Sequence, residues 1–336
     1  MKRDAFFDNA KLLLIFLVVF GHMIEPFTHD SRPIYTLYTW IYTFHMPAFI
    51  FLSGFFAKGA GNKDYVLKLA RKLILPYLIF QLVYTGYFFI MGDDGWLNGP
   101  FLPHWSLWFL FSLFCWHILL YWFKRIPPIM GIAISLEIGL VIGYFSDIGQ
   151  FFSLSRTFVF FPFFLAGYWL TKEHMQKLRS VRVKEAGLVM MLVVAGLIAA
   201  FPDISSGWLL GSKSYDVLGT PEMGGIFRLV VYVLGALMTI SVLSWVPNKQ
   251  FRVTNFGGRT LYVYLLHGFF IQFFRHEDLF KVDNILDLLG LAIMSAAIVL
   301  LLSTNPIRTL TQPVIEVRTS RIQNWWSRLT NKQSSA

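Results

Sequence analysis

Long apolar stretches recur along the whole chain, separated by short segments that hold most of its polar residues. A helix that crosses the hydrocarbon core of a membrane needs about 20 mainly apolar residues. The pattern therefore predicts an all-α, polytopic integral membrane protein. Ten spans are expected, at about residues 11–27, 35–57, 72–91, 105–123, 129–146, 154–171, 185–201, 226–246, 259–275 and 285–304.

The basic residues predict how these spans are oriented. If the N-terminus is cytoplasmic, the inner segments and the tail hold 23 of the 29 Lys and Arg residues. Cytoplasmic loops of membrane proteins carry such an excess. We therefore expect ten spans with both termini cytoplasmic, in the cell membrane.

Composition excludes other classes of protein. Only 14% of the residues are charged and 56% are hydrophobic, so the chain lacks the polar surface of a soluble enzyme. The same apolar content excludes intrinsic disorder. One cysteine, Cys115, excludes an intramolecular disulfide framework and a multi-cysteine metal site.

The net charge of +10 indicates attraction to anionic lipids of the inner leaflet, and we expect no nucleic-acid partner. Residues 1–310 are predicted to form the membrane domain. Residues 311–336 form a cytoplasmic basic-aromatic tail, in which Arg318, Trp325 and Trp326 suit a membrane interface.

A polar stripe is expected along the first helix. Lys11 and His22 are eleven residues apart, which at 100° per residue returns to within about 20° of one face. Asp8 lies three residues before Lys11 and can pair with it. An ionisable side chain inside a span costs free energy, so a functional role is the first hypothesis for it. Alternatively, Lys11 snorkels to lipid phosphates and His22 bonds to a carbonyl.

Two further histidines are expected near mid-membrane. His45 precedes Pro47, which removes a backbone donor and frees a carbonyl near residue 43. His45 is thus either a structural partner of that carbonyl or a catalytic group. His267 shares a helix face with Tyr264. The three histidines could also hold a metal, but no His-x-x-x-His pair supports this, and no metal is predicted.

Other charged residues in or near the spans are explained either by the orientation of the spans in the membrane or by a bonding partner. Arg71 and Lys72 open the third span, where topological charge alone explains them. Arg156 lies at the outer end of the sixth span, so a carboxylate, phosphate or hydroxyl partner is implied. Glu137 lies inside the fifth span and needs a partner. Ser53 and Gly54 indicate close helix packing.

Several motifs together resemble the membrane-bound acyltransferase-3 family, in particular its fucose 4-O-acetylase-related branch. Lys11-x10-His22, preceded by Asp8, is similar to the Arg/Lys-x10-His signature of that family. Other matching blocks follow in order: Phe44-His45-Met46-Pro47 with Ser53-Gly54, Arg71 to Pro76-Tyr77, Leu107-Trp108-Phe109, Arg156 with Phe163 to Tyr168, and Tyr264-Leu265-Leu266-His267.

The resemblance implies transfer of an acyl group, usually acetyl from acetyl-CoA, to a sugar hydroxyl of a cell-surface or lipid-linked glycan. Lys11, Arg71 and Lys72 would meet the anionic donor on the cytoplasmic side. His22 would act as general base or form an acyl-imidazole, with Asp8 and Lys11 ordering the donor. His45, Arg156, Tyr264 and His267 would bind the acceptor or the developing oxyanion.

The alternative is a polytopic transporter of a small solute or lipid-linked sugar. Proline-kinked helices and an uneven polar interior suit such a carrier. No paired short or interrupted helices recur in two related halves, however, and discontinuous helices would be the sign to seek.

Overall fold

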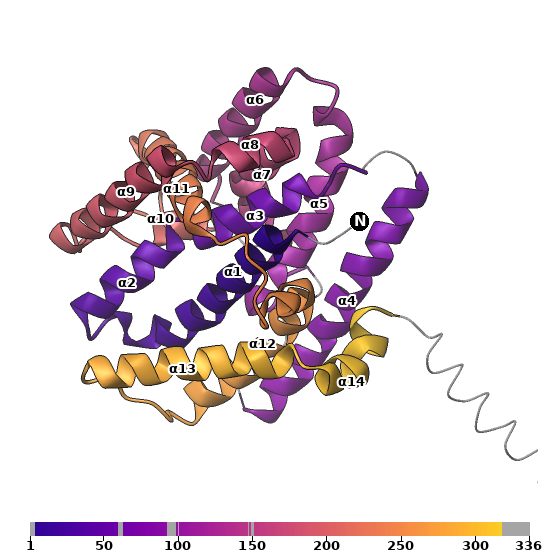
Figure 1. Cartoon of the computed structure of the whole chain (residues 1–336), viewed down its shortest axis with the longest axis vertical. Helices are drawn as coiled ribbons and strands as arrows, with labels where there is room; N and C mark the ends of the chain where they lie inside the picture. The colour runs from indigo at the N-terminus through magenta and orange to yellow at the C-terminus, as the bar shows by residue number, and fades with distance from the viewer. Residues whose placement is uncertain are drawn as a thin grey trace, which may run out of the picture.

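Helices form every regular element in the described part of the chain, which comprises residues 4–59, 63–92, 99, 101–146, 148 and 151–317 of a computed structural model. The arrangement is shown in Figure 1. The helices are α1 (Ala5–Ile24), α2 (Arg32–Tyr42), α3 (His45–Phe55), α4 (Lys63–Ile90), α5 (Trp108–Phe123), α6 (Pro128–Val141), α7 (Leu154–Trp169), α8 (Lys172–Lys177), α9 (Val181–Ala200), α10 (Gly207–Leu210), α11 (Gly224–Trp245), α12 (Thr260–His276), α13 (Ile285–Leu302) and α14 (Asn305–Ile315).

Six helical segments within the described residues are long and apolar enough to cross a membrane. They are Ala5–Thr28, Asp64–Ile90, Trp105–Phe123, Val181–Ala200, Gly224–Trp245 and Ile285–Leu302. The other predicted spans coincide with shorter or interrupted helices, such as α7 with 16 residues and α12 with 17. The all-α membrane character is therefore confirmed.

The second predicted span is broken in two. It runs as α2 and α3, with Thr43 and Phe44 between them. Pro47 falls in the first turn of α3, where a missing backbone N–H interrupts no intrahelical bond. The interruption thus avoids the clash that a proline causes inside a continuous helix. Pro47 in the sequence predicts a kink within one helix, whereas the structure has two separate helices.

Glycines let α3 and α7 cross at close range. A methyl group on Gly54 would lie 1.9 Å from the Phe164 carbonyl oxygen, and one on Gly167 would lie 1.9 Å from that of Phe51. Only residues without a β-carbon allow this approach. The expected close packing at Gly54 is confirmed.

Helix α1 runs through the middle of the bundle and packs against α3, α12 and α13 (Figure 1). Near its start, Asn9 donates to the carbonyls of Pro247 and Lys249 and accepts from the Thr254 hydroxyl. Gly257 lies against the Asp8 carbonyl. These contacts fix the segment before α12 at the start of α1, so α1 and α12 run side by side in the same direction.

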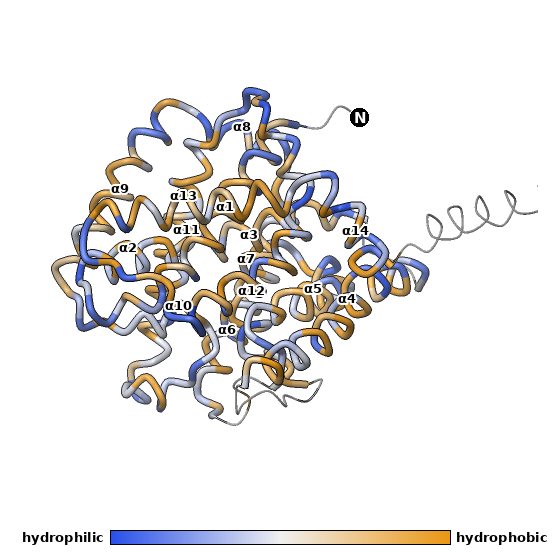
Figure 2. Tube along the Cα trace, turned by 90° about the horizontal axis from the view of Figure 1, so that it is seen from below, coloured by the Kyte–Doolittle hydropathy of each residue, from blue (hydrophilic) through white to orange (hydrophobic). Residues whose placement is uncertain are grey.

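Apolar side chains cover much of the outside. In α9 the exposed residues include Val189, Leu192 and Leu197, each more than half exposed. Figure 2 shows hydrophobic stretches along the long helices, with hydrophilic segments gathered at the connections. Such a surface is stable in lipid rather than in water.

Two of the sequence predictions concern residues at the periphery of the molecule. Glu137 lies exposed on α6, and no hydrogen bond or ion pair to another described residue reaches it. The predicted tail begins inside α14, which crosses residue 310. Arg318, Trp325 and Trp326 lie outside the described residues.

Candidate active site

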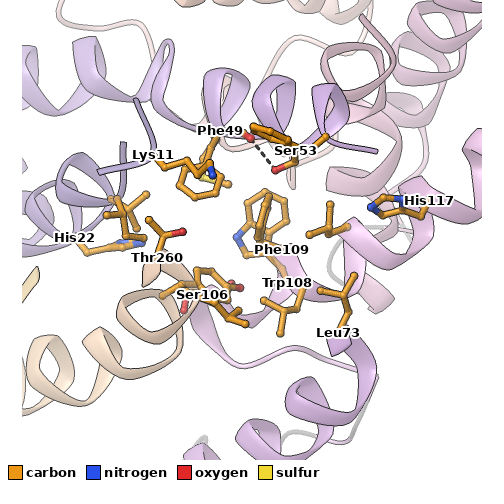
Figure 3. Close-up of a pocket in the computed structure, with 18 residues that line it drawn as sticks. Lys11, His22, Phe49, Ser53, Leu73, Ser106, Trp108, Phe109, His117 and Thr260 are labelled. Carbon is orange, nitrogen blue, oxygen red and sulfur yellow. Dashed lines mark hydrogen bonds between the residues drawn. The ribbon is translucent and has the colours of Figure 1, made fainter. Parts of the chain in front are cut away.

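A cavity of about 410 Å³ lies among α1, α3, α4, α5 and α12. Lys11 and His22 both line it, as do Ser53, Tyr264 and His117. Figure 3 shows His22 and His117 at opposite ends of this space, with Lys11 and Phe109 between them. The eleven residues from Lys11 to His22 span about 16 Å of helix, so the stripe on α1 follows the cavity wall.

A second cavity, of about 400 Å³, lies beyond His22. Its walls include Glu25, Phe27 and His29, which follow α1, and Arg275, Asp278 and Phe280 at the end of α12. His22 is the one residue among those described that lines both cavities. We call the two spaces the Lys11 cavity and the Glu25 cavity.

The carboxylate of Glu25 orients the His22 ring. The Nδ1 atom of His22 lies 3.3 Å from Glu25 Oε2 and 3.4 Å from the Tyr42 hydroxyl. Arg275 Nη2 donates to the same carboxylate oxygen (2.8 Å) and to the His22 carbonyl (2.5 Å). A proton on Nδ1 would therefore be held by Glu25, which leaves Nε2 as the basic atom.

Aromatic rings enclose His22. The Trp105 ring centroid lies 4.4 Å from that of His22, and the His267 ring lies 5.1 Å from Trp105 and 5.9 Å from His22. Trp105 has a φ of 38°, a left-handed conformation that is uncommon outside glycine. Gly268 makes room for it, because a methyl group there would lie 2.6 Å from the indole. Strain of this kind concentrates at functional sites.

At the other end of the stripe, Asp8 and Lys11 form an ion pair of 3.5 Å. Asp8 is buried, and Lys11 also lies over the Phe56 ring, 4.7 Å from its centroid. The structure thus brings Asp8, Lys11 and His22 to one helix face, as the spacing predicts.

The remaining predicted residues lie at different distances from the cavities. Tyr264 lines the Lys11 cavity and donates to the Ser106 carbonyl. Arg156 stacks over Trp108, a lining residue, at 5.0 Å, and its guanidinium reaches the Ser212 hydroxyl at 3.4 Å. Arg156 therefore has the hydroxyl partner that its position implied.

The two other histidines bond to backbone carbonyls. The Nδ1 atom of His45 lies 3.0 Å from the Ile41 carbonyl, at the break between α2 and α3. The Nδ1 atom of His267 lies 3.0 Å from the Val263 carbonyl, and its buried Nε2 has no hydrogen-bond partner among the described residues. Arg71 is exposed on α4 and does not line the Lys11 cavity, although Leu73 does.

Sequence reasoning missed Glu25, Arg275, Trp105 and His117. The spacing of His22 and Glu25 is a signal that could have revealed the carboxylate, since residues three apart on a helix are neighbours. Arg275 comes from more than 250 residues away. His117 lies 2.8 Å from the Tyr65 hydroxyl, on another helix. No local sequence pattern indicates Arg275 or His117 as a site residue.

Within the described residues, no group of three His, Cys, Asp or Glu side chains is placed to hold a metal ion. The site offers an oriented imidazole, a partly buried ion pair and an aromatic enclosure between two cavities.

Comparison with known proteins identifies related sequences. A family model described as an acyltransferase domain, that of the acyltransferase-3 family, matches residues 4–304. The nodulation protein NolL of Mesorhizobium japonicum is 36% identical over 92 residues, which are 25% of each chain. NolL of Sinorhizobium fredii is 39% identical over 61 residues, or 17% of each chain.

The matched part thus covers about a quarter or less of the length of these curated relatives. No solved structure matches the chain. The family model nevertheless covers nearly the whole sequence and includes every residue of both cavities. The protein belongs to the acyltransferase-3 family.

Proposed function

We propose that this protein is a membrane acyltransferase that moves an acyl group, acetyl in the first instance, from acyl-CoA to a sugar hydroxyl of a cell-surface or lipid-linked glycan. The observation that carries the proposal is the position of His22, which lines two cavities and has its Nδ1 atom against Glu25. One imidazole can thereby meet a donor from one side and an acceptor from the other.

The Lys11 cavity suits the donor. Its walls are mostly apolar, and its volume falls within the range of about 300–1,000 Å³ that is usual for ligand pockets. The pantetheine arm of a CoA thioester can lie along the stripe from Lys11 to His22. Lys11, held by Asp8, faces the anionic end of the donor.

The Glu25 cavity suits a sugar. Phe27, Phe274 and Phe280 offer apolar faces, while His29 and Asp278 offer polar groups for hydroxyls. Ligand sites combine apolar walls with a few polar groups in this way. Tyr264 lines the Lys11 cavity, and the His267 ring lies 5.9 Å from that of His22. Together with His45 and Arg156, these residues would orient the reacting groups or stabilise the oxyanion.

The reaction is an acyl transfer assisted by His22. In the direct route, Nε2 of His22 takes the proton of the sugar hydroxyl as its oxygen attacks the thioester carbonyl. The tetrahedral intermediate collapses, the C–S bond breaks, and the imidazolium returns the proton to the leaving thiolate. Glu25 stabilises the imidazolium throughout.

A covalent route uses the same atoms. Nε2 of His22 attacks the thioester carbonyl, the C–S bond breaks, and CoA leaves as the thiolate, so that the acylated ring keeps its Nδ1 proton beside Glu25. The sugar oxygen then attacks the acyl carbon, the C–Nε2 bond breaks, and the hydroxyl proton passes to Nε2. Acid quenching of the enzyme with labelled acetyl-CoA and no acceptor separates the routes, because only the covalent one leaves label on the protein.

In the membrane, we propose ten spans with both termini cytoplasmic. The Lys11 cavity would then open toward the cytoplasm, where acyl-CoA is found, and the Glu25 cavity toward the outer face. The excess of basic residues on the inner side would bind anionic lipids.

The test is transfer of radiolabelled acetyl from acetyl-CoA to glycan in membranes that contain the protein. The proposal predicts alkali-labile label in the glycan fraction, above the level in membranes without the protein. Absence of such label, with the protein present and folded, would overturn it.

A further inference from the structure

A polar pocket of about 310 Å³ lies at the start of α12. It is lined by Asn255, Gly258, Arg259, Tyr262, Arg308 and Glu316. We infer that this pocket binds phosphate groups and, resting on the proposed function, that it holds the phosphates at the nucleotide end of acyl-CoA.

Backbone as well as side chains lines the pocket. Gly257 and Gly258 lie in a 3-10 helix (Thr254–Arg259) that leads directly into α12. Gly258 lines the pocket and leaves this backbone uncovered.

Two arginines add charge and donors. Arg259 comes from the start of α12 and donates to the Ser303 carbonyl at 2.5 Å, and Arg308 comes from α14. Because a guanidinium carries five donors, one backbone bond leaves Arg259 able to bind an oxyanion. Arginine is the residue best matched to phosphate geometry.

The one acidic residue of the pocket is held by other groups. Glu316 accepts from the Tyr262 hydroxyl at 2.5 Å and from Gln312 at 2.8 Å, and it lies 4.0 Å from Arg308. Tyr262 and Gln312 thus hold Glu316, and at 4.0 Å from it Arg308 keeps guanidinium donors for a phosphate. The pocket therefore sets two arginines against one carboxylate.

The pocket and the Lys11 cavity share the first turns of α12. Arg259 and Tyr262 face the pocket, whereas Thr260 and Tyr264 line the cavity. From Arg259 to His267, the rise along the helix is about 12 Å. A ligand that passes around the first turns of α12 from the pocket into the Lys11 cavity would need an extended arm of about this length to reach His22, and CoA has such an arm.

A lipid headgroup is the other source of phosphate at this place. Helix α14 exposes Leu310 and Val314 on one side, which suits a helix at a membrane surface. The experiment must therefore compare CoA with lipid.

Binding of CoA and of dephospho-CoA, which lacks the 3′-phosphate, should be measured with the purified full-length protein in nanodiscs. Arg308→Gln tests the pocket, because this side chain is 39% exposed and its loss should not unfold the chain. Arg252→Gln is the matched control, since Arg252 is exposed beside the same segment and does not line the pocket.

Loss of a charge-assisted contact weakens binding by roughly tenfold to a hundredfold. We expect this loss for CoA in Arg308→Gln, little change in Arg252→Gln, and weaker binding of dephospho-CoA than of CoA only when Arg308 is present. Repeating the series in nanodiscs with neutral and with anionic lipid identifies the phosphate source.

If CoA binds equally to the wild type and to Arg308→Gln, the site is overturned while the proposed function stands. If Arg308→Gln instead changes the dependence on anionic lipid alone, the pocket binds lipid phosphate and the CoA assignment is wrong. If the wild type binds no CoA, the proposed donor itself is wrong.

Discussion

In the proposed reaction, Glu25 acts on His22 through the ring nitrogen that does not take the substrate proton. The carboxylate fixes the tautomer and stabilises positive charge on the ring, and Arg275 in turn holds the carboxylate at 2.8 Å. Glu25 is thus a positioning residue, since it acts on the reaction through His22.

Glu25→Gln should lower kcat by about a hundredfold, because the amide keeps the shape but lacks the charge that orients the imidazole. The KM for acetyl-CoA should stay near its wild-type value, since the proposed place of the donor is the other cavity. Glu277→Gln is the matched control, because Glu277 is exposed at the same end of α12. An unchanged kcat in Glu25→Gln would remove Glu25 from the mechanism.

At this scale, residues that follow helical spacing were predictable. Asp8, Lys11 and His22 share a face because 3.6 residues make a turn, and the sequence alone placed them on one stripe. Arg275 was not predictable, because its contact with Glu25 depends on how α12 lies beside α1. Helical spacing does not indicate the role of Trp105 either, because only its ring contacts reveal its place beside His22.

Among the elements, the crossing of α3 and α7 fixes the wall of the Lys11 cavity. Phe49 and Ser53 on α3 line that cavity, and the same helix packs its backbone onto α7 through Gly54. The position of the wall therefore depends on the close crossing of α3 and α7.

Gly54→Ala should destabilise the protein by about 1–3 kcal/mol, since the added methyl group would lie 1.9 Å from a carbonyl oxygen. Thermal unfolding in detergent, followed by tryptophan fluorescence, measures the loss. Gly196→Ala in α9 is the control, because nothing lies within 4 Å of a methyl group there. Equal melting temperatures for the two variants would contradict the packing argument.

The positions of the helices were largely predictable, because long apolar runs leave few alternatives in a chain of this composition. The break at Thr43 and Phe44 was less so, since Pro47 is compatible with a kink or with a new helix start. Glu137 is exposed because its face of α6 points outward. The sequence does not predict which face points outward, since apolar residues occur all round that helix.

On the scale of the whole molecule, the proposed roles of the two cavities beside His22 imply an orientation of the protein in the membrane. The donor side must face the cytoplasm if acyl-CoA is the donor. The loop before α11 would then lie outside, and the segment before α12 would lie inside.

Cysteine labelling tests this orientation. With Cys115→Ser as background, Lys213→Cys should react with a membrane-impermeant maleimide in intact cells, because its loop lies outside in the ten-span arrangement. Arg252→Cys should react only after the membrane is opened. Both side chains are exposed, so the reverse pattern would show that the orientation is wrong.

The most direct test of the central claim is acetyl transfer by His22→Ala, measured with labelled acetyl-CoA in membranes that hold equal amounts of wild-type and variant protein. The account predicts a loss of at least about a hundredfold, because no other described group lines both cavities. Transfer at the wild-type rate by the variant would contradict the account.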